Sequence, residues 1–169
     1  MIVAITGPTG SGKSTVASKL AKQIEKCVNI DADHLKHMVV SGFIYDKSPD
    51  GIKQWELLGE NIGLLAYNFQ EAGYNVIING YINEPAWKNI AKHIDLTHKF
   101  LLLPHLDKVK SRDKERHEDF IMGDKAVLEH HDYFSTADFY KDFTKIDSTD
   151  HNVEQTVDQV LTIIRAKSE

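Results

Sequence analysis

The sequence predicts an α/β fold, a three-layer α/β/α sandwich in which a mostly parallel five-stranded sheet lies between two layers of helices. Short apolar runs alternate along the chain with longer segments whose apolar residues recur at helical spacing. The three β-branched residues Val76–Ile78 are typical of a central parallel strand that is buried on both faces. With 169 residues and 41% hydrophobic content, the chain is expected to form a single domain over residues 1–169.

The first strand is expected at Ile2–Ile5, and a glycine-rich segment follows it directly. Gly7–Thr15 reads GPTGSGKST and matches G-x-x-x-x-G-K-[ST] at every fixed position. Apolar residues at helical spacing continue after it: Val16, Ala17, Leu20, Ala21 and Ile24. An ordinary glycine turn would also join a strand to a helix, but the full motif with both flanks in place favours a phosphate-binding P-loop.

The residue types of this loop suit a polyphosphate. Glycines let the backbone come close to phosphate oxygens, and the helix that begins near Gly12 adds its positive dipole end. Lys13 would neutralise charge on the β- and γ-phosphates, and the Ser14 hydroxyl suits Mg²⁺. The candidate nucleotide-binding residues here are Gly7, Pro8, Thr9, Gly10, Ser11, Gly12, Lys13, Ser14 and Thr15.

The second strand is expected at Cys27–Ile30, and the carboxylates Asp31 and Asp33 follow it. Because the carboxyl ends of parallel strands meet at one edge of a sheet, both should lie beside the glycine loop. There, either carboxylate is a candidate Mg²⁺ ligand. In the simpler alternative, one of them only N-caps the helix through His34–Met38.

Ser41–Gly51 has no sustained periodicity and is expected to be a loop. A long amphipathic helix follows, with Gly73 as its stop signal and with Trp55, Leu58, Ile62, Leu65, Ala66 and Phe69 on one face. The next strand ends at Asn79, where P-loop proteins usually carry an acid. Asn79 brings no charge, so Mg²⁺ would depend on Ser14, the phosphates, water and Asp31 or Asp33.

A helix at Glu84–Asp95 and a strand at Lys99–Leu103 precede a charged segment, Asp107–Asp119. Mixed charge usually indicates a solvated helix with ion pairs. However, Lys108, Arg112 and Arg116 recur every four residues, which would place three cations on one helical face. The segment around residues 112–125 is therefore expected to be a lid that closes on phosphates. The last strand is expected at Phe143–Asp147, and Val153, Val157, Val160, Leu161 and Ile164 form the core face of a closing helix.

Composition argues against several functions. The net charge of −5 disfavours long nucleic acid as a partner. No apolar run approaches the ~20 residues that span a bilayer, and the chain opens directly on a strand, so neither a membrane anchor nor a signal peptide is expected. Cys27 is the single cysteine, which suits a reducing, cytoplasmic setting. The nine histidines, with His130 and His131 adjacent, lack the spacing of a zinc site.

Four segments together resemble the P-loop small-molecule kinases of the nucleoside-monophosphate-kinase-like fold: GPTGSGKST, Asp31-Ala32-Asp33, Arg112-x-x-x-Arg116 and Ile146-Asp147-Ser148-Thr149. The chain looks most similar to the gluconate-kinase-like and chloramphenicol-phosphotransferase-like branches, with polynucleotide 5′-hydroxyl kinases a further relation. The resemblance covers most of the chain, and its most specific motif is the P-loop.

This resemblance implies roles for individual residues. Asp33 matches the aspartate that accepts the proton of the substrate hydroxyl in those kinases. Arg112 and Arg116 match lid arginines that stabilise the transferring phosphoryl group. Ser148 and Thr149 match a segment that commonly lies beside the adenine.

The leading hypothesis is therefore an ATP- and Mg²⁺-dependent kinase that phosphorylates a hydroxyl of a small molecule, such as a sugar acid or an antibiotic. A nucleotide or polynucleotide 5′-kinase is a second hypothesis. A nucleotide-gated switch is a third, because Thr144–Asp147 resembles the guanine-reading motif N-K-x-D. The chain lacks a D-x-x-G segment after Asn79, which disfavours the switch. The acceptor and the oligomeric state carry no signature in the sequence.

Overall fold

The computed structural model of the protein describes residues 1–118 and 121–166. Five strands form one sheet in the order β2-β3-β1-β4-β5, and each neighbouring pair is parallel. They are β1 (Ile2–Thr6), β2 (Cys27–Asp31), β3 (Asn75–Gly80), β4 (His98–Leu102) and β5 (Thr144–Ile146). The expected fold class is confirmed.

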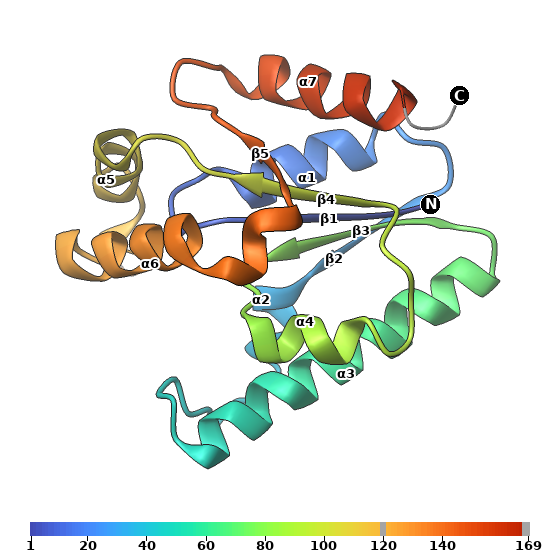
Figure 1. The fold of residues 1–169 in the computed structure, drawn as a ribbon, viewed down its shortest axis with the longest axis horizontal. Coiled ribbons are helices and arrows are strands. Elements are labelled where there is room, and N and C mark those ends of the chain that lie inside the picture. Colours follow the sequence, from blue (N-terminus) through green and yellow to red (C-terminus); the bar gives the residue numbers. More distant parts are fainter. Residues whose placement is uncertain (119–120, 167–169) are drawn as a thin grey trace.

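Helices cover both faces of the sheet, which gives the three expected layers (Figure 1). Helices α1 (Lys13–Ala21) and α7 (Val153–Ala166) lie on one face, and α3 (Pro49–Glu71) and α4 (Glu84–Ile90) lie on the other. The arrowheads of β3 and β4 point toward the side of the molecule that carries α5 (Leu106–Lys114) and α6 (Asp124–Thr136) (Figure 1). The short helix α2 (Ala32–Lys36) directly follows β2.

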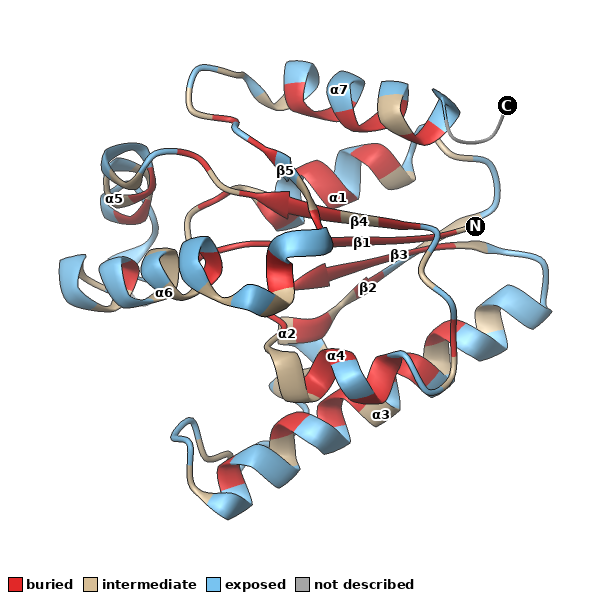
Figure 2. Ribbon diagram, viewed as in Figure 1, coloured by how far each residue is buried: buried red, intermediate tan, exposed pale blue. Residues whose placement is uncertain are grey.

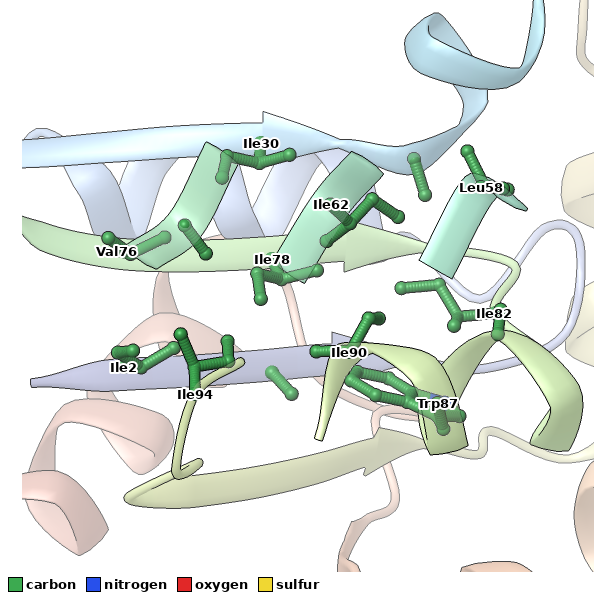
Figure 3. Close-up of a cluster of buried hydrophobic side chains, with 14 of the residues drawn as sticks. Ile2, Ile30, Leu58, Ile62, Val76, Ile78, Ile82, Trp87, Ile90 and Ile94 are labelled. Carbon is green, nitrogen blue, oxygen red and sulfur yellow. The ribbon is translucent and has the colours of Figure 1, made fainter. Parts of the chain in front are cut away.

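The strands are buried because their side chains alternate between two cores. Along β1, Ile2 and Ala4 belong to the core under α3 and α4, whereas Val3 and Ile5 belong to the core under α1 and α7. Figure 2 shows the resulting red strands between helices whose buried residues face inward. Figure 3 shows the first core, where Ile78 of β3 lies between Ile62 of α3 and Ile90 of α4. Fully burying such a side chain contributes about 1.5–3 kcal/mol.

Local capping explains where the helices on this face begin. The Ser48 hydroxyl accepts a hydrogen bond from the N–H of Gly51 at 3.2 Å, and Pro49 occupies the first turn of α3. Asn83 caps α4 in the same way through the N–H of Ala86. The expected loop over Ser41–Gly51 is therefore three residues too long, because helix α3 has already begun at Pro49.

One further expectation was wrong, and one stretch carried no prediction. The helix expected over Glu84–Asp95 ends at Ile90, because the next hydrogen bonds, from Lys92 to Asn89 and from His93 to Ile90, close tighter turns than those of an α-helix. No helix was expected in 124–142, where α6 and a 3₁₀ helix, η2 (Asp138–Asp142), are found. Tyr140 of η2 is buried and donates from its hydroxyl to the carbonyl of Ile82 at 2.7 Å, which ties this segment to the loop after β3.

Candidate active site at the P-loop

The central strand β1 delivers the P-loop to the carboxyl edge of the sheet. Gly10 and Gly12 have φ of 82° and 90°, which glycine adopts without strain. A Cβ at Gly10 would lie 3.0 Å from the Val109 side chain, so the loop also needs a glycine there to pack against α5. The N–H of Ser11 donates to the carbonyl of Pro8 at 3.1 Å, and α1 begins at Lys13.

Lys13 is buried, and its ammonium donates to the carbonyl of Pro8 at 3.3 Å. Burial lowers the pKa of Lys13, and the charge of Asp33 opposes that effect. Arg116 acts on Lys13 as a neighbouring positive charge, and Asp31 and Lys36 contribute further. The charges of Asp31, Asp33 and Arg116 therefore lie near enough to affect Lys13. Asp31 ends β2, Asp33 lies in α2, and Arg116 follows α5.

The pair of aspartates at the end of β2 divides into a cap and an ion-pair partner. Asp31 Oδ1 caps α2 by accepting from the N–H groups of Asp33 at 2.9 Å and His34 at 3.4 Å. The Asp33 carboxylate lies 2.8 Å from Lys36 Nζ. Although burial alone would raise the pKa of Asp33, Lys36 and then Lys13 lower it below its ordinary value. Asp33 is therefore an ionised acceptor near Lys13, and the cap is Asp31.

Asn79 is fully buried at the end of β3. Its amide donates to Asn29 Oδ1 at 2.9 Å, and its own Oδ1 has no hydrogen-bond partner among the described residues. In the sheet register, Asn79 lies between Ile5 of β1 and Asp31 of β2. An oxygen that is buried without a partner beside the P-loop strand is suited to receive a ligand or an ordered water.

A cavity of about 190 Å³ borders the P-loop at Ser11, Gly12 and Thr15. Its lining comes from the P-loop, α1, α5 and the chain after β5: Ser11, Gly12, Thr15, Val16, Arg112, Ser148, His151, Asn152, Val153 and Thr156. Ser11 Oγ, Ser148 Oγ and His151 Nδ1 are buried here without hydrogen-bond partners among the described residues. Leaving such groups unsatisfied costs about 1–3 kcal/mol each, so a ligand that supplies partners would be favoured. His151 has no motif that could have identified it from the sequence.

Arg112 lies against this cavity. Its guanidinium donates to the carbonyls of Ser11 at 3.4 Å and Ser148 at 3.3 Å, so it joins the P-loop to the segment after β5. Thr149 does not line the cavity; its hydroxyl bonds Asp147 and accepts from the N–H of His105 at 2.8 Å. Ser148 thus lines the cavity, whereas Thr149 bonds the segment that follows β4.

The expected basic face of the lid is wrong in part. Helix α5 ends at Lys114, so Arg116 lies beyond the helix and does not continue the face of Lys108 and Arg112. Arg116 lies 3.6 Å from the buried carboxylate of Asp113. The same carboxylate accepts from the N–H of Met122, at 3.1 Å to one oxygen, and of Gly123 at 3.0 Å. Asp113, which sequence reasoning missed, anchors both sides of residues 119–120, which lie outside the described residues.

His130 was also missed as a site residue. Its Nδ1 lies 3.0 Å from the Thr9 hydroxyl in the P-loop, and its ring packs on Tyr81 with 4.8 Å between centroids. Its neighbour His131 faces elsewhere, with Nε2 3.0 Å from the carbonyl of Pro104. Sequence alone offers no signal that separates the two histidines.

Other features of the described chain do not compete with this site. A second hollow of about 320 Å³ lies between the later part of α3 and the turns after α4, and it includes none of the predicted site residues. Over residues 1–118 and 121–166, no group of three or more His, Cys, Asp or Glu is placed to hold a metal ion. Within the same ranges, no helix has the length and apolarity needed to cross a membrane.

The chain is similar to known proteins in sequence and in fold. A family model described as an AAA domain matches residues 2–134. A protein of Pyrococcus furiosus named "Putative adenylate kinase" is 28% identical over 173 aligned positions, which cover 98% of this chain and 85% of that protein.

Two solved structures share the fold. A sugar kinase from Janibacter has a TM-score of 0.70 at 17% identity, covering 97% of this chain and 94% of that one. The tunicamycin resistance protein of Deinococcus radiodurans has a TM-score of 0.71 at 17% identity, covering 96% and 94%. The resemblance to P-loop kinases of the nucleoside-monophosphate-kinase-like fold is thereby confirmed, and the chain belongs to this AAA-domain family of kinase-like P-loop proteins.

Proposed function

We propose that the protein is an ATP-dependent kinase that transfers the γ-phosphoryl group to a hydroxyl of a small molecule. One observation carries this proposal: the two ends of the P-loop differ in character. The charges of Asp33 and Arg116 act on the pKa of Lys13 on one side, and a cavity with unpartnered polar atoms opens on the other. This is the arrangement expected if the nucleobase of ATP lies in the cavity and phosphoryl transfer takes place beside Lys13.

The nucleotide would lie along the P-loop. Its base would occupy the cavity, where Ser148 Oγ and His151 Nδ1 offer hydrogen bonds and the Arg112 guanidinium offers a planar cation. Its phosphates would replace the Pro8 carbonyl as the partner of Lys13 and would accept from P-loop N–H groups. The Ser14 hydroxyl, Asp31 and the unpartnered oxygen of Asn79 would hold Mg²⁺, which supplies additional positive charge when bound. A donor set with one carboxylate suits a metal that also binds phosphates and water.

The chemistry would proceed by displacement at the γ-phosphorus. The acceptor hydroxyl oxygen forms a bond to phosphorus, the bond to the ADP oxygen breaks, and Asp33 receives the hydroxyl proton. Asp33 suits this role because its neighbours keep it ionised and because the cap of α2 is provided by Asp31. Lys13 and Arg116 would stabilise charge on the transferring group, which is the largest contribution that a kinase site makes.

The acceptor would enter beside Asp33, where aromatic rings gather. Lys36 Nζ lies 5.7 Å from the ring centre of Tyr45 and 5.8 Å from that of Trp55. Phe43 contacts both rings, and Tyr81 contacts Trp55 at 5.9 Å between centroids. These aromatic side chains favour an acceptor that contains a ring, which includes sugars, aromatic antibiotics and nucleosides.

A nucleotide acceptor is the second candidate, and the name of the Pyrococcus relative favours it. The two can be separated by measuring ATP consumption with three panels: sugars and sugar acids, phenicol and aminoglycoside antibiotics, and nucleosides with their monophosphates. GTP is tested in parallel as donor.

Lys13→Ala and Lys19→Ala are the matched variants for this screen. Lys19 lies on the same helix but is exposed and pairs with Glu154. We expect at least one acceptor to raise ATP consumption in the wild type and in Lys19→Ala, and Lys13→Ala to lose it. Turnover that survives Lys13→Ala, or a preference for GTP with no acceptor-dependent turnover, would refute the kinase proposal.

A further inference from the structure

His130 connects the P-loop to α6 at a point that the proposed mechanism does not use. Its Nδ1 lies 3.0 Å from Thr9 Oγ1, and its half-buried ring packs on Tyr81. A hydroxyl can donate to a neutral imidazole nitrogen or accept from a protonated one, so this contact permits either protonation state.

Thr9 lies at the phosphoryl end of the P-loop. Lys13 Nζ reaches the carbonyl of Pro8, the residue immediately before Thr9. The cavity proposed for the base is instead lined by Ser11, Gly12 and Thr15. His130 therefore lies next to the place where the last phosphate of the nucleotide would lie, opposite the base.

The charges around His130 come from several elements. Lys13 of α1 and Lys36 of α2 are the positive groups, and Glu129 of α6 and Asp113 of α5 are the negative ones. Burial lowers the pKa of His130 below 6.5, and Lys13 adds to this effect more strongly than Glu129 opposes it. The Tyr81 phenol adds no charge, because burial raises its pKa to about 12. His130 is therefore neutral at pH 7 in the free protein.

A terminal phosphate would reverse this balance. Its charge would neutralise Lys13, and it would offer oxygens that accept a hydrogen bond from an imidazolium. We propose that His130 takes up a proton from solvent when Mg²⁺-ATP binds and then serves, with Lys13 and Arg116, as a third cation facing the γ-phosphate. The step moves one proton and breaks no other bond. It rests on the proposed function, because it requires a nucleoside triphosphate at the P-loop.

The test is calorimetric titration of the full chain with Mg²⁺ and a β,γ-imido ATP analogue at pH 7, in buffers that differ in ionisation enthalpy. The dependence of the observed heat on the buffer gives the number of protons taken up for each nucleotide bound. His130→Gln keeps an amide that can bond Thr9, and His131→Gln is the adjacent control. Thermal melting checks that all three proteins are folded.

We expect proton uptake in the wild type and in His131→Gln. Uptake should be smaller when ADP replaces the ATP analogue, and smaller in His130→Gln than in the wild type. Equal uptake in the wild type and His130→Gln would overturn the inference while the proposed function stands. Equal uptake with ADP and the ATP analogue would overturn the assignment to the terminal phosphate. A wild-type protein that binds no nucleotide would refute the proposed function, and the inference with it.

Discussion

Asp33→Asn is the substitution that tests the proposed chemistry most directly. In the wild type, Lys36 Nζ lies 2.8 Å from the Asp33 carboxylate. Asparagine is almost the same size as aspartate, and its Oδ1 can still accept a hydrogen bond from Lys36 Nζ. The charge attraction is lost, but the Asp33 side chain is 35% exposed and the Lys36 side chain 11%, so solvent screens part of it. We expect a loss of about 1 kcal/mol or less in the free energy of unfolding, which lowers Tm by about 2–4 °C in a chain of this length.

Turnover should change much more than stability. A missing general base costs about 10²–10⁴-fold in rate, whereas ATP binding should change little because the proposed mechanism has Asp33 contact the acceptor and not the nucleotide. The assay is initial rate with the acceptor found in the screen, alongside nucleotide affinity and thermal melting. Asp31→Asn is the control for stability only: asparagine caps a helix as well as aspartate, so Tm should hold, whereas its Mg²⁺ dependence tests Asp31 as the proposed metal ligand.

Two results would refute this reasoning. Full activity of Asp33→Asn together with an inactive Asp31→Asn would mean that the proton-acceptor role was assigned to the wrong carboxylate of the pair. Full activity of both would exclude carboxylate base chemistry at this edge of the sheet.

The pH dependence of stability gives an independent check on Asp33. Its pKa in the folded chain lies below the ordinary value of 3.8. Its contribution to stability is therefore present above that value and is lost as the pH falls through the lowered pKa. The difference in Tm between the wild type and Asp33→Asn should be constant near pH 6 and shrink below pH 3.8. A difference that grows on acidification would contradict the ion pair with Lys36.

Three further outcomes are expected. Lys13→Ala should lower turnover by about 10²-fold or more with little change in Tm, measured by ATP consumption and melting. Asp113→Ala should remove the carboxylate that accepts from the N–H of Gly123, and hydrogen exchange at that amide should rise; unchanged protection would show that Asp113 is no anchor. Asn79→Asp should cost about 1–3 kcal/mol of stability because it replaces the donor to Asn29 by a buried charge, and Mg²⁺-ATP should restore part of the loss in a melting assay. A stable Asn79→Asp that gains nothing from Mg²⁺-ATP would exclude a metal beside Asn79.

Local chemistry was sufficient to predict much of the fold. The P-loop glycines, the β-branched strands and the amphipathic helices each depend on neighbouring residues in sequence, so their patterns are visible without a structure. The helix start at Pro49 was also readable, since Ser48 and Pro49 form a capping signal. Helix α6 was harder, because its buried residues, Val127 and Phe134, lie seven positions apart in a segment of polar residues.

The sequence by itself determined that this chain carries a P-loop in an α/β kinase-like fold and that carboxylates follow β2 beside it. Only the tertiary structure decided which carboxylate caps α2 and which pairs with Lys36. It also decided that Arg112 lies at the cavity while Arg116 lies near Lys13. The contact between His130 and Thr9 is likewise visible only in the structure. Thr9 and His130 are 121 positions apart, and no local pattern specifies a contact over that separation. Periodicity and capping depend on residues that are close in sequence. The long-range contacts of a side chain depend instead on how the helices pack onto the sheet.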